Sequence, residues 1–180
     1  MTSYSDAYQD QIPIIADLVE RSFTASEGAE EGKVVGALAK SLMESTPSDQ
    51  ISVFTAWQAG RIAGAIIFSK MFFTKDKRNV AILSPVAVAP DCQSKGVGTD
   101  LINHGLNTMS ELGKDFAVTY GDPNYYSRFG FRHVTTQKVP APFPLSHPHG
   151  WQALSLIDDI VDDLKGEAVC VPALHRSEYW

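Results

Sequence analysis

Cysteine is scarce in this 180-residue sequence, and Cys92 and Cys170 are its only two examples. Two cysteines cannot build a disulfide framework, and no CxxC motif occurs. We therefore expect both residues to be free thiols in a reducing compartment, and the protein to be cytoplasmic.

Long hydrophobic runs are also missing. The longest apolar stretches, such as GAIIF, are far shorter than the roughly 20 residues that span a bilayer. The first residues, MTSYSDAYQDQIPII, have no basic segment followed by an apolar one, so no signal peptide is recognisable. The sequence predicts no membrane partner.

The sequence also lacks an excess of positive charge. The formal net charge is -6, which disfavours a polyanionic partner such as nucleic acid. What is present is ordinary for a globular protein, with 44% hydrophobic and 20% charged residues. The length fits one domain, which we place at residues 1–158, with residues 159–180 as an extension packed on it.

Helical periodicity appears in three segments. The spacing of apolar residues predicts helices over residues 12–23, 30–43 and about 97–112, and a short helix precedes residue 130. The apolar faces of the second and third helices include Val34 and Leu112, respectively. Gly113 stands where a left-handed cap would end the third helix.

Strand-like segments alternate with these helices. The resulting order favours an α/β fold, with a mixed α+β sheet flanked by helices. Residues 74–79 are expected to be a polar connection, and the proline-rich residues 139–150 a loop. Strands are expected over residues 51–57, 62–73, 80–90, 115–120, 130–139 and 151–157.

The segment QSKGVG, residues 93–98, lies between an apolar strand and a helix. A helix N-terminus presents unpaired N–H groups and a partial positive charge, and glycine lets an anion approach the backbone closely. A Walker A motif is absent, and the third glycine of a dinucleotide fingerprint would fall at Leu101. A flexible turn with no ligand remains the alternative, with Lys95 either adding a cation or pointing to solvent.

The surrounding residues resemble a known family. VAVAPDCQSKGVGTDLI is similar to the acyl-CoA signature Q/R-x-x-G-x-G/A of the GNAT N-acetyltransferase superfamily, with Gln93, Gly96 and Gly98 at the defining positions. YYSRFGF, residues 125–131, resembles the Y-x-x-x-G-F element of that superfamily, and WQAGRIAGAIIF resembles one of its hairpins. The resemblance covers roughly residues 10–140. Within the superfamily, the sequence most resembles a bacterial subgroup typified by YhbS-like proteins.

The resemblance implies a GNAT fold that transfers the acetyl group of acetyl-CoA to an amine, by direct attack in a ternary complex and without a metal. Tyr126 would protonate the departing thiolate, and a backbone N–H at or near Val88 would stabilise the oxyanion. Asn124 would either bond to a pantetheine amide or be a turn residue. Backbone groups of the strand end Val86, Ala87 and Val88 would pair with pantetheine, and the pyrophosphate would be held by Gln93, Ser94, Lys95, Gly96, Val97 and Gly98.

Several alternatives stay open. A non-catalytic acyl-CoA-binding module on the same fold is the competing function, and Tyr126 could be a core tyrosine, with Tyr125 as the neighbour most easily confused with it. The acceptor could be a small molecule or a protein, and the protein a monomer or a homodimer. Residues weighed for minor roles are Glu27, Glu30 and Glu31 as bases, Ser84 as a pocket residue, and His147 and His149 as a metal pair.

Overall fold

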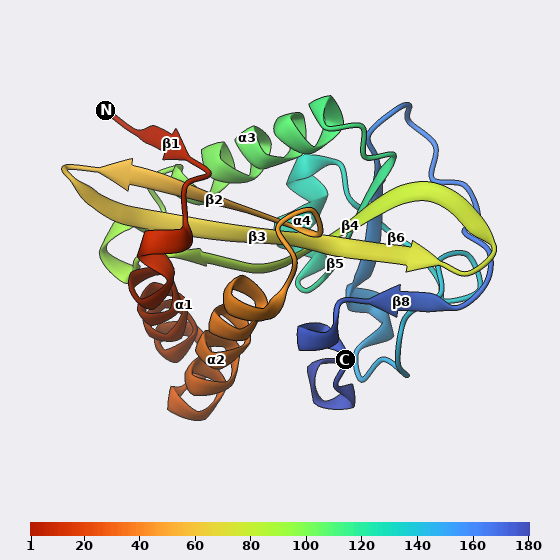
Figure 1. Ribbon diagram of the computed structural model, residues 1–180, viewed down its shortest axis with the longest axis horizontal. Helices are drawn as coiled ribbons and strands as arrows, with labels where there is room; N and C mark the ends of the chain where they lie inside the picture. The colour runs from red at the N-terminus through yellow and green to blue at the C-terminus, as the bar shows by residue number, and fades with distance from the viewer. The chain divides into compact units, whose positions relative to one another are not determined.

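The computed structural model describes residues 1–180 and contains a mixed α/β fold, as the sequence predicts. The sheet has the strand order β1-β2-β3-β4-β5-β7-β6, and β8 pairs with β3 (Figure 1). The helices are α1 (Ile12–Glu27), α2 (Ala29–Ser45), α3 (Val97–Glu111) and α4 (Pro123–Tyr126). The strands are β1 (Ser3–Ser5), β2 (Ile51–Gln58), β3 (Arg61–Phe73), β4 (Asp76–Val88), β5 (Phe116–Tyr120), β6 (Arg132–His133), β7 (Trp151–Ser155) and β8 (Ala168–Cys170).

The chain forms two compact units that share its longest strands. The first comprises Met1–Phe68 and Pro85–Gly105, and the second comprises Ser69–Ser84 and Leu106–Trp180. Strands β3 and β4 and helix α3 each contribute residues to both units. The predicted boundary at residue 158 does not coincide with this division, and the placement of residues 159–180 as an extension stays a prediction.

In the first unit, α1 and α2 lie side by side (Figure 1). Each follows the apolar period of the sequence, because Ile15 and Leu18 of α1 and Leu38 and Leu42 of α2 are fully or almost fully buried. Val34 was expected on the apolar face of α2 but is 41% exposed. The first strand has three residues, and it pairs antiparallel with β2.

In the second unit, β5 lies between two partners. It pairs parallel with β4, from Val80 opposite Phe116 to Leu83 opposite Thr119, and antiparallel with β7. The predicted cap at Gly113 is confirmed, with a φ of 76° and a backbone bond from Gly113 N–H to the Ser110 carbonyl. Leu112, expected in the core, is 61% exposed.

Two strand boundaries differ from the sequence expectation by more than two residues. Residues 76–79 belong to β4 and not to a connection, and the chain turns only at Thr74 and Lys75, whose N–H groups donate to Glu167 and Lys165 carbonyls. All four side chains of this segment are polar, and those of alternate residues point outward. Its composition is therefore that of a loop, although the segment is a strand. Strand β6 ends at His133, because the N–H groups of Lys138 and Val139 both donate to the Thr135 carbonyl and close a turn.

Three further expectations concern the cysteines, membrane-spanning helices and the proline-rich segment. Both cysteines are free thiols, as predicted, and the structure buries both. No helix has the length and apolar character needed to cross a membrane. The proline-rich residues 139–150 form a loop that ends in one 3-10 turn, Pro148–Gly150.

Candidate active site

The end of β4 presents alternate residues to solvent. Ser84, Val86 and Val88 are half-buried, whereas Ala87 between the valines is 1% exposed. Period-two alternation therefore places the three half-buried residues on one face. The register between β4 and β5 runs only to Leu83 opposite Thr119, and β4 continues to Val88.

The predicted anion loop follows immediately. Residues 93–96 are exposed, and both Ser94 and Gly96 have a left-handed backbone, with φ of 60° and 84°. The side-chain amide of Gln93 donates to the Val88 carbonyl over 3.2 Å and so fastens the loop to the strand end. Left-handed residues turn successive N–H groups toward one side of a loop, which is the geometry of an anion-binding nest.

Helix α3 begins at Val97, directly after the loop. Its first intrahelical bond runs from Asp100 N–H to the Gly96 carbonyl over 2.9 Å, so the preceding N–H groups have no helical partner. A Cβ placed on Gly96 would meet only the Asp100 carboxylate, at 3.7 Å. The backbone therefore suits an anion, while Asp100 limits the positive potential there.

A pair of charges missed by the sequence analysis borders this loop. The guanidinium of Arg61, at the start of β3, forms an ion pair with Asp91, and the Arg61 hydrogen bond lowers the pKa of the Asp91 carboxyl. The Arg61 Nη2 atom also lies 3.5 Å from the Cys92 sulfur, which is buried. No sequence pattern links residues thirty positions apart, so only the fold reveals the pair.

The other predicted site element, YYSRFGF, lies in the second unit. Asp122 caps α4, because its side chain accepts a 2.9 Å hydrogen bond from Asn124 N–H. The Tyr126 ring is half-buried and stands edge-on to Phe131, with centroids 5.8 Å apart. Gly121 allows the ring to approach, since a Cβ there would lie 2.9 Å from Tyr126 Cε2.

Burial raises the pKa of the Tyr126 phenol well above its ordinary value of 10.0. The group therefore stays protonated at neutral pH and can act as a proton donor. Burial also raises the pKa of Tyr125, whose ring lies under the Arg128 guanidinium, 4.6 Å from the centroid.

The carboxylates and histidines considered for minor roles all lie at the surface. Glu27, Glu30 and Glu31 are exposed around Gly28, which separates α1 from α2. His147 and His149 are exposed, with ring centroids 6.0 Å apart, and no group of three or more His, Cys, Asp or Glu could hold a metal.

A model of the GNAT acetyltransferase domain matches residues 3–134, a stretch that contains both the anion loop and Tyr126. The chain belongs to the GNAT acetyltransferase family. This assignment confirms the resemblance in the 93–98 and 125–131 segments.

Two curated GNAT relatives come from Escherichia coli strain K12. The uncharacterized N-acetyltransferase YjhQ is 31% identical over 147 residues, which cover 79% of this chain and 77% of that protein. The uncharacterized N-acetyltransferase YhbS is 28% identical over 107 residues, which cover 59% of this chain and 64% of that protein.

Solved GNAT structures share the fold. The crystal structure of YhbS from Escherichia coli in complex with CoA has a TM-score of 0.79 at 23% identity, covering 98% of this chain and 92% of that one. A GNAT acetyltransferase from Brucella melitensis in complex with acetyl-CoA has a TM-score of 0.75 at 22% identity, covering 96% of this chain and 97% of that one.

Proposed function

We propose that this GNAT protein transfers the acetyl group of acetyl-CoA to an amine by direct attack in a ternary complex. The observation that carries the proposal is the Gln93–Gly98 loop, with its two left-handed residues at the start of α3. Two similar folds that were crystallised with CoA or acetyl-CoA support the same donor.

The first unit supplies the donor-binding groups in this proposal. Backbone N–H groups of Gln93, Ser94, Lys95, Gly96, Val97 and Gly98 bind the pyrophosphate. Backbone groups of Val86, Ala87 and Val88 pair with the pantetheine amides, and Asn124 of the second unit is a further polar contact. The end of the β4–β5 register at Leu83 supports the pantetheine assignment, because β4 continues beyond it.

The reaction needs three things from the protein. A neutral amine must attack the thioester carbon, a donor must stabilise the oxyanion, and the thiolate must be protonated. We assign the oxyanion donor to the Val88 N–H and the proton donor to Tyr126, whose raised pKa keeps its proton in place until charge develops on sulfur. The donor enters as a substrate, so no metal is required by this scheme.

The test is an acetyl-CoA turnover assay that detects the released thiol over a panel of amines, with calorimetric titration of acetyl-CoA beside it. Amine-dependent thiol release with an acetylated product supports the proposal. Binding without thiol release for any amine would assign the chain to the alternative class, a non-catalytic acyl-CoA-binding module. Failure to bind acetyl-CoA would overturn both.

A further inference from the structure

Large apolar side chains are exposed beside the end of α3 in the second unit. Ile157 and Ile160 are 62% and 63% exposed, and Leu112 is exposed to a similar degree. The Ser110 hydroxyl donates a 3.2 Å hydrogen bond to the Leu156 carbonyl and so ties the two segments together. Leu112 and Ile157 are therefore neighbours at the surface. Exposed apolar residues that gather in one place are typical of interaction sites.

The same segment carries a strong negative charge. Residues 157–163, IDDIVDD, contain four aspartates, and all four are exposed. Only Asp162 forms an ion pair, with Arg78. The other three carboxylates have no cation of this chain beside them within ion-pair distance. We call Leu112 and residues 157–163 the acidic ridge.

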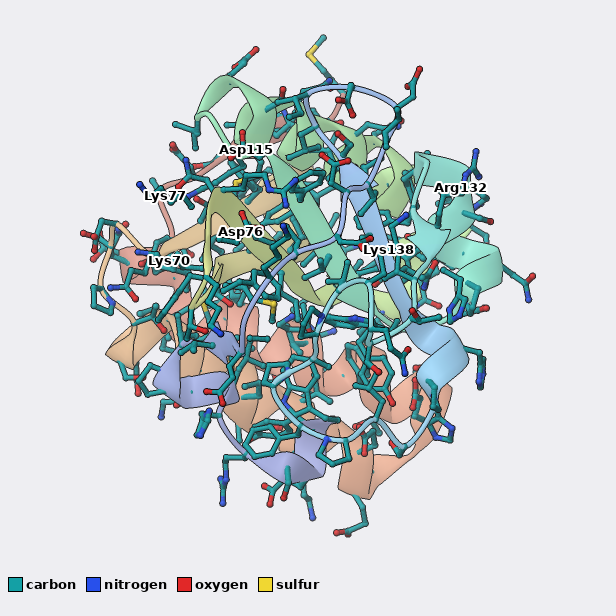
Figure 2. The ribbon with its side chains drawn as sticks, turned by 90° about the vertical axis from the view of Figure 1, so that its right-hand side faces the viewer. Lys70, Asp76, Lys77, Asp115, Arg132 and Lys138 are labelled. Carbon is teal, nitrogen blue, oxygen red and sulfur yellow. The ribbon has the colours of Figure 1, made fainter.

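The β3–β4 hairpin of this unit has an outer face of opposite charge. Lys70, Phe72 and Lys77 are exposed, whereas Met71 and Phe73 between them are buried. A two-residue turn joins the strands, so Phe72 and Lys77 are cross-strand neighbours. The Lys70 ammonium lies 5.9 Å from the centre of the Phe72 ring, which is 44% exposed. Figure 2 labels both lysines. We call Lys70, Phe72 and Lys77 the basic hairpin face.

We infer that a second copy of this chain docks on these surfaces, with the acidic ridge of each copy on the basic hairpin face of the other. The surfaces are complementary in charge and each has an exposed apolar centre, so the contact pairs aspartates with lysines around buried apolar side chains. Each copy carries both surfaces, so two copies related by a two-fold axis make both contacts at once. Nucleic acid and anionic membranes would be repelled by the ridge. The inference does not depend on acetyl transfer, because neither surface contains a residue of the proposed active site.

The dimer should be weak and sensitive to salt. We expect a dissociation constant of roughly 1–100 μM, as is usual for a small and partly polar interface. Raising the salt concentration from about 0.05 M to about 0.5 M should increase that constant by about 10-fold, because exposed charges are screened. Sedimentation equilibrium of the full chain over a range of protein concentrations measures both values.

Charge reversal on either surface should separate the two copies. Asp159→Lys with Asp163→Lys reverses the ridge, and Lys70→Glu with Lys77→Glu reverses the hairpin face. Either pair of substitutions brings like charges together in both contacts. We expect each double variant to raise the dissociation constant by at least about 10-fold.

Two further variants separate charge from apolar contact. Lys33→Glu with Lys40→Glu alters two exposed lysines of α2 and changes the net charge as much as the hairpin variant does. This control should leave the dissociation constant unchanged. Ile157→Ser with Ile160→Ser keeps every charge and should also weaken the dimer, because the apolar centre of the ridge is lost.

The deciding experiment mixes the two charge-reversed variants in equal amounts. Each contact of the mixed dimer pairs opposite charges, whereas each contact in either variant alone pairs like charges. The inference is supported if each variant is monomeric alone, is folded by circular dichroism, and forms a dimer in the mixture. A mixture that stays monomeric overturns it, as does a dimer of the unmodified protein that neither reversal weakens. Monomers of the unmodified protein up to about 1 mM, ten times the weakest expected dissociation constant, would also overturn it. An assembly larger than a dimer would overturn the two-fold arrangement.

Discussion

The ammonium group of Lys95 donates a 2.8 Å hydrogen bond to the backbone carbonyl of Asp91, four residues earlier. The only cationic side chain inside the anion loop is thus turned back onto the loop backbone. Asp91 is also the ion-pair partner of Arg61, so the loop entrance is fixed from both sides. Phosphate binding is therefore expected to depend on backbone N–H groups more than on the Lys95 charge.

The first prediction follows for Lys95. Lys95→Ala should weaken acetyl-CoA binding only about 2- to 5-fold, because an exposed cation contributes little and is screened. The loss should shrink further between about 0.02 M and about 1 M salt, as the Debye length falls to about 3 Å. Calorimetric titration at the two salt concentrations measures it. A large loss that is independent of salt would mean that Lys95 contacts the phosphate directly.

The second prediction concerns Gly96. A valine there must adopt a φ of 84°, and its side chain would occupy the open space in which the pyrophosphate is proposed to bind. Gly96→Val should raise the Kd for acetyl-CoA by about 10-fold or more, which corresponds to at least about 1.4 kcal/mol. Isothermal calorimetry measures the Kd, and circular dichroism checks that the protein is folded.

Gly60 provides the matched control for backbone strain. It lies in the turn between β2 and β3 with a φ of 76°, and no atom lies within 4 Å of a Cβ placed on it. Gly60→Val should lower the free energy of unfolding by about 1–2 kcal/mol, which is the usual penalty for a left-handed residue other than glycine. Its Kd for acetyl-CoA should stay unchanged. Equal affinities for the two variants would contradict the loop assignment.

The third prediction concerns Tyr126. Removing its hydroxyl deletes an interaction that strengthens only as charge develops on sulfur, so kcat should fall with little change in acetyl-CoA affinity. Tyr126→Phe should lower kcat by about 10²-fold, the lower end for general acid catalysis, because a CoA thiolate is a tolerable leaving group. Steady-state kinetics with the best amine of the panel measures the effect.

Tyr125→Phe is the control for this experiment. The Tyr125 ring packs against Phe129 and Arg128, and these contacts survive the loss of the hydroxyl. The variant should therefore be nearly silent. If Tyr125→Phe has a lowered kcat and Tyr126→Phe is fully active, Tyr125 is the proton donor and Tyr126 is not. If both variants keep the full kcat, the proton donor is water.

The fourth prediction concerns stability in acid. The Arg78 side chain bonds to the Asp76 carboxylate and lowers the pKa of Asp76 from 3.8 to about 2. Asp76 lies at the start of β4 and is labelled in Figure 2. Asp115, also labelled there, accepts a hydrogen bond from the N–H of Asn79, which is another residue of β4. A lowered pKa in the folded state means that stability is present above pH 3.8 and is lost as the pH falls toward 2. Asp76→Asn should therefore be less stable than the unmodified protein at pH 7, by about 1–2 kcal/mol after allowance for solvent screening, and most of the difference should be lost by about pH 2.

Urea denaturation at a series of pH values measures this difference. Asp162 is the control, because it is the second partner of Arg78 at 3.0 Å but its side chain is 64% exposed. Asp162→Asn should change the free energy of unfolding by less than about 0.5 kcal/mol. A deficit in Asp76→Asn that is the same at pH 2 and pH 7 would rule out the ion pair as its cause.

The sequence by itself determined the features that depend on residues close together in the chain. Apolar spacing located α1, α2 and α3, and the order of segments indicated a mixed α/β sheet. The Q-x-x-G-x-G and Y-x-x-x-G-F motifs located the anion loop and Tyr126 because each is a short segment with fixed spacing. Polar composition gave a wrong prediction at residues 76–79, because a strand made only of polar residues has the composition of a loop. Local spacing could not detect the Thr135 turn that ends β6.

Only the tertiary structure decided which distant residues meet. Arg61 reaches Asp91, Arg78 reaches Asp162, and β8 pairs with β3 across about one hundred residues of chain. The His147 N–H donates a 2.7 Å hydrogen bond to the Tyr120 hydroxyl in the same way, although the two residues are 27 positions apart. Such contacts follow from strand register and burial, which depend on the whole sheet. For this reason the sequence could name Tyr126 as a candidate proton donor but could not show that its ring lies against Gly121 and Phe131.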